Sequence, residues 1–292
     1  MNARTLPSLC WGLIVISLTL VSSAAGAGDD ESSVRDLVRK YVRRQDQAAA
    51  AGTSKTTGPK KGDVPDKLPG DLRKVIALEY TVLLLKGDGE EAVDPHKHEF
   101  KLGDKIHVQV EPLSDLYIYI FHEGASGERI CLLPDKNETP PLAKRESTLR
   151  LPSDGYIEFG PPAGEERLIV VATEEKVDRN VLTTLVFKKP DEKLSAEEQA
   201  IQKKLKARDQ KTLKSIREQR SQGTKFRGLF TDEVLAEIGG DLKGEAGTRA
   251  VLEEPPHGAE KSTFTMSVSP DKEGPRELFV SIPLKSTSGK KN

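Results

Sequence analysis

The sequence predicts a mainly β protein, an antiparallel β-sandwich of immunoglobulin-like or jelly-roll-like type. From Val75 to about Thr173, apolar residues alternate with a period of two in short runs, which is typical of strands. Turn-forming Gly, Pro, Ser and Asp residues separate the runs. About seven such strands predict two packed sheets, because each sheet must bury an apolar face. An N-terminal helical arm, a long basic helix and a C-terminal β-hairpin complete the predicted fold.

Composition and charge restrict the classes of function. The 292 residues are 36% hydrophobic and 31% charged, which leaves room for one or two domains but is too polar for a chain folded throughout. A formal net charge of −1 predicts no global attraction to nucleic acid or to a membrane. Any such binding must therefore come from a local excess of charge.

Residues 1–27 predict a secretory signal peptide. Arg4 provides a positive start, an apolar run covers residues 9–21, and small residues end at Ala27. The run is shorter than the roughly 20 residues of a membrane-spanning helix, so no transmembrane segment is expected after cleavage. Cys10 precedes the apolar run, whereas a lipid-modified cysteine would follow it. We therefore expect an exported protein, periplasmic or extracellular, that is not a lipoprotein.

Residues 28–51 predict an amphipathic helical arm. Ser33 precedes a helical repeat of apolar residues at Val34, Leu37, Val38, Tyr41 and Val42. Such an arm either packs on the domain or binds a partner, and the pattern allows both. Residues 52–70 are rich in Gly, Pro, Thr and Lys and predict a flexible linker.

The sandwich domain is predicted to span residues 71–190. Residues 116–121 are apolar at every position, which indicates a central strand covered on both faces. The break from Gly124 to Gly127 predicts a hairpin turn, because Ser126 lacks the Gly-x-Ser-x-Gly spacing of a nucleophile elbow. Cys131, the only cysteine after the signal peptide, is interpreted as a buried hydrophobic residue rather than a catalytic thiol.

Residues 191–240 predict a basic helix followed by a short helix. The basic helix is expected from Ser195 to about Gln222, and the short one ends at Gly239-Gly240. The cations of the basic helix form either a solvated face or a contact with an anionic envelope polymer, lipid headgroups or an acidic protein patch. Dedicated nucleic-acid binding is not expected, because no aromatic stacking residues accompany the cations. The candidate partner-binding residues are Lys204, Arg208, Lys211, Lys214 and Arg217.

Residues 241–292 predict three further strands. The last two, "STFTMSVSP" and "ELFVSIPLKS", each have one apolar face and are expected to pair as a hairpin. So few strands are not stable alone, so they should join the main sheet or cover its exposed face.

The histidines are the candidate metal ligands. His96 and His98 stand two residues apart, a spacing that places both on one face of a strand. His107 and His122 would add ligands if the sheet brought them together, and His257 lies in a loop. No carboxylate or cysteine completes a known zinc spacing, so no cofactor is predicted. Four glutamates are interpreted as solvated strand ends rather than acid–base pairs: Glu123, Glu128, Glu165 and Glu166.

One part of the chain resembles a known family. The segments "FKLGDKIHVQVEP", "DLYIYIFHEGASGERICLLPDK", "STLRLP" and "FGPPAGEERLIVVATEE" resemble the bacterial domain of unknown function 4384 over roughly residues 99–175. The resemblance implies a compact β domain of exported or membrane-attached bacterial proteins. It implies no catalytic residues.

These observations predict an exported, non-enzymatic β-sandwich module of the bacterial envelope that binds a protein, polysaccharide or other surface partner. The alternative hypothesis is a metal-assisted hydrolase that uses the histidines.

The signal-peptide hypothesis predicts the mass of the mature protein. Cleavage after Ala27 should give a chain that begins at Gly28 when the protein is isolated from an expressing bacterium and its intact mass is measured. A chain that retains Met1, or that carries lipid on Cys10, would contradict the hypothesis.

Overall fold

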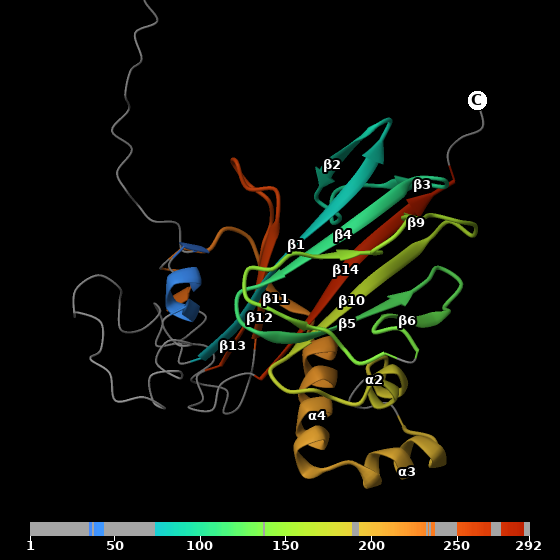
Figure 1. Ribbon diagram of the computed structural model, residues 1–292, viewed down its shortest axis with the longest axis vertical. Helices are drawn as coiled ribbons and strands as arrows, with labels where there is room; N and C mark the ends of the chain where they lie inside the picture. Colours follow the sequence, from blue (N-terminus) through green and yellow to red (C-terminus); the bar gives the residue numbers. More distant parts are fainter. Residues whose placement is uncertain are drawn as a thin grey trace, which may run out of the picture. The chain divides into compact units, whose positions relative to one another are not determined.

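Two β-sheets with helices outside them make up the described part of the chain in this computed structural model (Figure 1). All described residues belong to one compact unit, Ser32–Asn292. The predicted signal peptide and linker lie outside the described residues. The structure describes residues 35–36, 38–43, 74–136, 138–188, 193–231, 233, 235–236, 250–269 and 276–288.

The first sheet combines strands from both ends of the chain. They are β1 (Lys74–Lys86), β2 (Gly89–Val93), β4 (Lys105–Pro112), β8 (Leu149–Leu151), β9 (Ile157–Glu158), β11 (Thr224–Arg227), β12 (Ala250–Glu254) and β13 (Thr263–Ser269). The strand order is β11-β12-β13-β1-β4-β8, with β2 paired to β1 and β9 paired to β4. The β11–β12 pair is parallel and the other pairs are antiparallel.

The second sheet has β14 between a very short strand and a long one. Its strands are β3 (Phe100–Lys101), β5 (Leu116–Glu123), β6 (Arg129–Leu133), β7 (Leu142–Ala143), β10 (Glu165–Thr173) and β14 (Glu277–Thr287). The order is β3-β14-β10-β5-β6, with β7 paired to β5. The short β14–β3 pair is parallel and the other pairs are antiparallel. The structure thus confirms a mainly β fold in which two sheets contain short parallel pairs.

The main core lies between the two sheets, as a β-sandwich requires. On each strand, alternate residues point inward and are removed from water. The alternation predicted from the sequence places Ile106, Val108 and Val110 of β4 in one cluster with Leu116, Ile118 and Ile120 of β5.

Helices α2 (Arg179–Leu185) and α4 (Ala207–Gln222) cover one end of the outer face of the second sheet, and α3 (Ala196–Lys204) packs beside α2. Tyr119 and Phe121 of β5 point toward them and pack with Leu182 and Ile216. The Tyr119 hydroxyl donates a hydrogen bond to the Val177 carbonyl at 2.7 Å. Strand β5 is therefore covered on both faces, as its doubly apolar sequence predicts.

The predicted single basic helix is wrong, because the chain breaks between α3 and α4. Leu205 and Lys206 have extended backbone angles, and the Gln210 side chain donates to the Gln202 and Leu205 carbonyls at 3.2 and 3.1 Å. The break turns Leu205 toward the apolar cluster beside the second sheet. The run of cations contains no signal for this turn. The segment predicted as the next short helix begins as strand β11 and is helical at the described residues 233, 235 and 236, whereas Gly239-Gly240 lies outside the described residues.

The N-terminal arm packs on the outer face of the first sheet. In the described residues 35–36 and 38–43 it is helical, and Val38, Tyr41 and Val42 are buried in a cluster with Phe264 and Met266 of β13. Three arginines at four-residue spacing contact acidic side chains of the sandwich, in the pairs Arg35–Glu254, Arg39–Glu79 and Arg43–Glu146. Of the two interpretations of the arm, the structure shows the packed one.

The predicted C-terminal hairpin does not form. Strand β13 pairs with β1 and β12 in the first sheet, whereas β14 pairs with β10 and β3 in the second. Each strand has one strongly apolar face, but the two faces are buried in different places: that of β13 under the N-terminal arm and that of β14 in the main core. Among the described helices, none has an apolar stretch long enough to cross a membrane.

The sandwich core predicts a severe effect of a buried charge. Ile118 is fully buried between the sheets, so Ile118→Asp should lower the free energy of unfolding by several kcal/mol, roughly 4, because the carboxylate has no partner there. Ile130 of β6 is 47% exposed, and Ile130→Asp should change it by less than about 1 kcal/mol. Urea denaturation measures both. Equal midpoints for Ile118→Asp and the parent protein would refute the inward placement of this strand.

Candidate functional site

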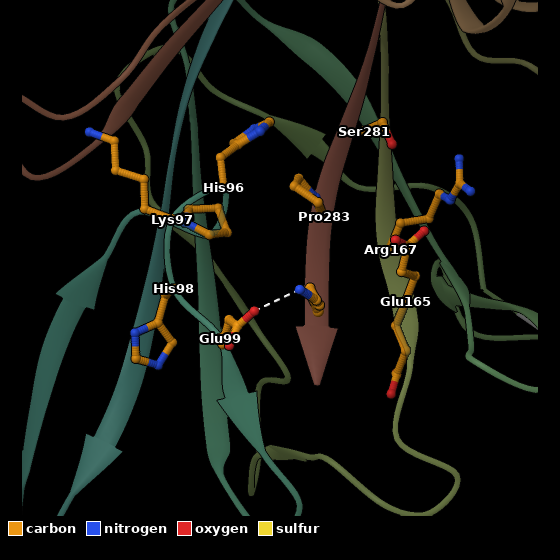
Figure 2. A pocket seen from close by; sticks show the side chains of 11 residues that line it. His96, Lys97, His98, Glu99, Glu165, Arg167, Ser281 and Pro283 are labelled. Carbon is orange, nitrogen blue, oxygen red and sulfur yellow. Dashed lines mark hydrogen bonds and ion pairs between the residues drawn. The ribbon is translucent and has the colours of Figure 1, made fainter. Parts of the chain in front are cut away.

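A polar groove of about 540 Å³ lies at the edge of the second sheet. Figure 2 shows His96 and Lys97 of the β2–β3 loop on one side, Ser281 and Pro283 of β14 in the middle, and Arg167 of β10 on the other side. The remaining lining residues are Pro95, His98, Glu99, Glu165, Glu166 and Lys285. Side chains of both charge signs therefore surround one strand.

The β14 edge beside the groove is open because its neighbours cover only its two ends. At one end, the Gln219 side chain of α4 accepts from the Phe279 N–H at 2.9 Å and donates to the Glu277 carbonyl at 3.2 Å. At the other, β3 pairs with Ser286 and Thr287 only. Backbone groups of odd-numbered residues point away from β10, so the edge groups of residues 281 and 283 pair with no strand in the described part of the chain.

Residue types at this edge limit how a strand can pair with it. Pro283 has no N–H to donate, and Lys285 places a charge at the edge. Both features discourage long edge-to-edge pairing in natural sheets. Ser281 keeps an N–H and a carbonyl in the middle of the open stretch. The edge is suited to a short extended segment rather than to a full strand.

An ion pair joins the β2–β3 loop to β14 across the groove. Lys285 Nζ donates to Glu99 Oε1 at 2.6 Å, and this hydrogen bond lowers the pKa of Glu99 and raises the pKa of Lys285. On β10, Glu166 Oε2 lies 2.8 Å from His122 Nε2, and Arg167 Nε lies 3.0 Å from Glu123 Oε2. Lys285, Glu166 and Arg167 of the groove therefore each contact an acidic side chain or a histidine.

A charged network behind the groove holds the β2–β3 loop to the first sheet. Arg227 of β11 donates to Glu253 Oε1 at 2.9 Å and to Asp94 Oδ1 at 2.7 Å, and His96 Nε2 lies 2.9 Å from the same Glu253 oxygen. The Glu253 side chain is only 1% exposed. A buried carboxylate needs hydrogen-bonding partners. Arg227 and His96 supply them to Glu253, so the fold needs both residues at these positions.

Burial and hydrogen bonding oppose each other at Asp94. Burial disfavours its charged form, but hydrogen bonds from the Arg227 guanidinium and from the His96 N–H hold the pKa of Asp94 below its ordinary value. Nearby, burial and then the charge of Glu253 raise the pKa of Tyr80 well above its usual range. Asp94 is therefore ionised and Tyr80 neutral at pH 7.

The predicted metal ligands do not meet at one point. His96 lies beside Glu253, His107 Nδ1 lies 2.6 Å from Glu90 Oε1, and His122 lies beside Glu166. The remaining pairings are His257 with Glu254 at 3.4 Å and His98 edge-to-face against the Phe100 ring at 4.7 Å. In the described residues, no three His, Cys, Asp or Glu side chains are placed to hold a metal ion. Each of the four histidine–glutamate pairs lies in a different place.

The other sequence candidates separate into exposed and structural residues. Lys204, Arg208, Lys211 and Lys214 are exposed on α3 and α4, but Arg217 is buried and donates from Nε to the Lys188 carbonyl at 3.3 Å. Arg217 therefore serves the fold.

The glycine-containing break after β5 is a hairpin turn, as predicted. Gly124 and Glu128 pair across it through the Gly124 N–H and the Glu128 carbonyl, and Gly127 has a φ of +85°, which favours glycine. Half-buried Cys131 lies on β6, and burial raises the pKa of its thiol, so the thiol is protonated at neutral pH.

Sequence reasoning missed most of the groove. It noted His96, His98, Glu165 and Glu166 for other reasons, but it did not connect them with β14. A weak signal existed in "AVLEE", where two glutamates end an apolar strand and therefore require buried cations. No sequence pattern predicts that this strand contacts Arg227, the arginine in "TKFR".

The fold and the groove define a class: a two-sheet β-sandwich with a polar groove at an open sheet edge. Residues 99–176 match the family described as "Domain of unknown function (DUF4384)", which confirms the resemblance seen in the sequence. The match runs from the residue before β3 to the residues just after β10, and it contains Glu99, Glu165, Glu166 and Arg167 of the groove. No curated protein matches the chain.

The charged network predicts an unequal effect of two arginine substitutions. Arg227→Met should lower the free energy of unfolding by about 2–3 kcal/mol, because it removes a hydrogen-bond partner from buried Glu253 and from Asp94. Arg43→Met removes an exposed ion pair with Glu146 and should cost less than about 1 kcal/mol. Denaturation at pH 7 measures both.

The difference in unfolding free energy between the parent protein and Arg227→Met should depend on pH. A depressed Asp94 pKa contributes stability that is present above its unfolded value of about 3.9 and is lost as the pH falls through its folded value. The Asp94 part of the difference between parent and Arg227→Met should therefore disappear in acid. A difference that grows below pH 4 would contradict the role of Arg227 as the partner of ionised Asp94.

Proposed function

We propose that this protein is an exported, non-enzymatic module of the bacterial envelope whose groove binds a short extended segment of a partner protein. The observation that carries the proposal is the open β14 edge inside the groove. Backbone groups at a sheet edge recognise an extended chain through main-chain hydrogen bonds, and flanking side chains then select among sequences. Groove side chains of both signs favour a segment that carries both charges.

Export and the envelope location rest on the sequence of residues 1–27 and on the family resemblance. The match to residues 99–176 supports a β module without assigned catalytic residues. The hydrolase alternative needs several histidines on one ion. The distribution of four histidines among four separate glutamates supports the binding module instead. Stoichiometric zinc retained by the purified mature protein would favour the hydrolase.

The proposal predicts a specific effect of proline at the open edge. Ser281→Pro removes the edge N–H, which pairs with no described strand, so the β10 ladder should survive. A displayed library of random heptapeptides should yield binders of the parent protein. Their affinity should fall about 3- to 10-fold in Ser281→Pro, since one hydrogen bond is lost.

Ser281→Ala is the matched control, because it removes the hydroxyl and keeps the N–H. It should bind the selected peptides as the parent does. Circular dichroism and the denaturation midpoint check that both variants fold. The groove assignment fails if no peptide is selected, or if selected peptides bind the parent, Ser281→Pro and a Lys285→Glu variant equally.

A further inference from the structure

The turn between α3 and α4 gathers six exposed cations, which we name the basic elbow. Arg208 contacts Glu175 and Asp209, and Lys214 lies 3.7 Å from Glu218. The other four have no acidic side chain within ion-pair distance in the described part of the chain. The members of the basic elbow are Lys203, Lys204, Lys206, Arg208, Lys211 and Lys214.

Other cations of α4 point inward and bond to the backbone of the fold, unlike those of the basic elbow. Arg217 and Arg220 of α4 point inward, donating to the Lys188 and Val186 carbonyls at 3.3 and 3.2 Å. Lys206, in contrast, is the residue that precedes the first turn of α4, where a positive charge opposes the helix dipole. Helix stability therefore does not explain a cation at this position. Its charge remains available for a partner.

Exposed apolar residues distinguish between two kinds of anionic partner. A helix that lies in a bilayer surface needs an apolar face to insert. The apolar side chains Leu213 and Ile216 of α4 are buried against the second sheet. In the described residues, the exposed large apolar side chains lie elsewhere, at Ile130, Leu142, Tyr156 and Leu229. The elbow therefore presents charge without an inserting face.

We propose that the basic elbow binds a linear polyanion, a polymer that repeats sulfate, phosphate or carboxylate groups. Cations clustered on the outside of two successive helices gain free energy by displacing the counterions of such a polymer. The chain as a whole carries a formal charge of −1, so the attraction depends on the local cluster. This surface is separate from the groove, so one protein can hold a polymer and a protein segment at different places.

The test uses the mature protein and immobilised dextran sulfate as the probe. The elbow variant replaces Lys204, Lys206 and Lys211 with Gln, a good helix former, so the helices should persist. At low salt its affinity should be at least about tenfold weaker than that of the parent. The slope of log affinity against log salt should fall by about 2, since three cations no longer release counterions.

A matched control replaces three exposed lysines on other surfaces, Lys101, Lys136 and Lys261, with Gln. It has the same net charge as the elbow variant and should keep the parent affinity within about twofold. Equal losses in the two variants, or no retention of the parent, would overturn the proposal. So would binding to phosphatidylglycerol vesicles that needs the elbow while dextran sulfate binding does not. Ser281→Pro should leave polymer binding unchanged, which separates this result from the fate of the groove proposal.

Discussion

The structure depends on burying the inner faces of two sheets against each other. Neither sheet can be completed by neighbouring strands alone, because β1 lies between β4 and β13, and β14 lies between β3 and β10. Strands that are up to about two hundred residues apart in the chain must therefore pair before water is excluded from the core. The family match contains β3 to β10 but neither β1 nor β14, so in this chain the matched segment obtains its central partners from outside.

This constraint also produces the groove. Strand β14 must extend along the whole of β10 to close the core, but its other neighbour β3 has only two residues. The buried Gln219 side chain bonds to the Glu277 carbonyl and the Phe279 N–H and leaves the middle of the edge open. The β2–β3 loop, held by Arg227 through Asp94, then becomes the opposite wall. The long strand β14 therefore both closes the core and forms the edge at which we propose that a segment binds.

Charged residues divide into those that stabilise the fold and those that face water. Where the sandwich needs them, they pair with buried carboxylates: Arg35 of the arm with Glu254, and half-buried Arg227 with Glu253 behind the groove. Where the fold does not need them, as on the basic elbow, they face water. The sequence shows the number and spacing of these charges, but not which are buried. Arg208 and Arg217 are equivalent in a count of cations, yet only Arg217 lies under the sheet-facing side of α4.

The sequence by itself determined the sandwich class, the doubly covered strand β5, the hairpin at Gly124 and the family resemblance, because alternation and turn residues are local properties. Only the tertiary structure decided the partners of β13 and β14, the break at Leu205 and the meeting of the β2–β3 loop with β14. Strand pairing joins distant segments, and an apolar face is equally satisfied by several neighbours. The free energy of the complete core decides which strands pair, and no local sequence pattern predicts the outcome.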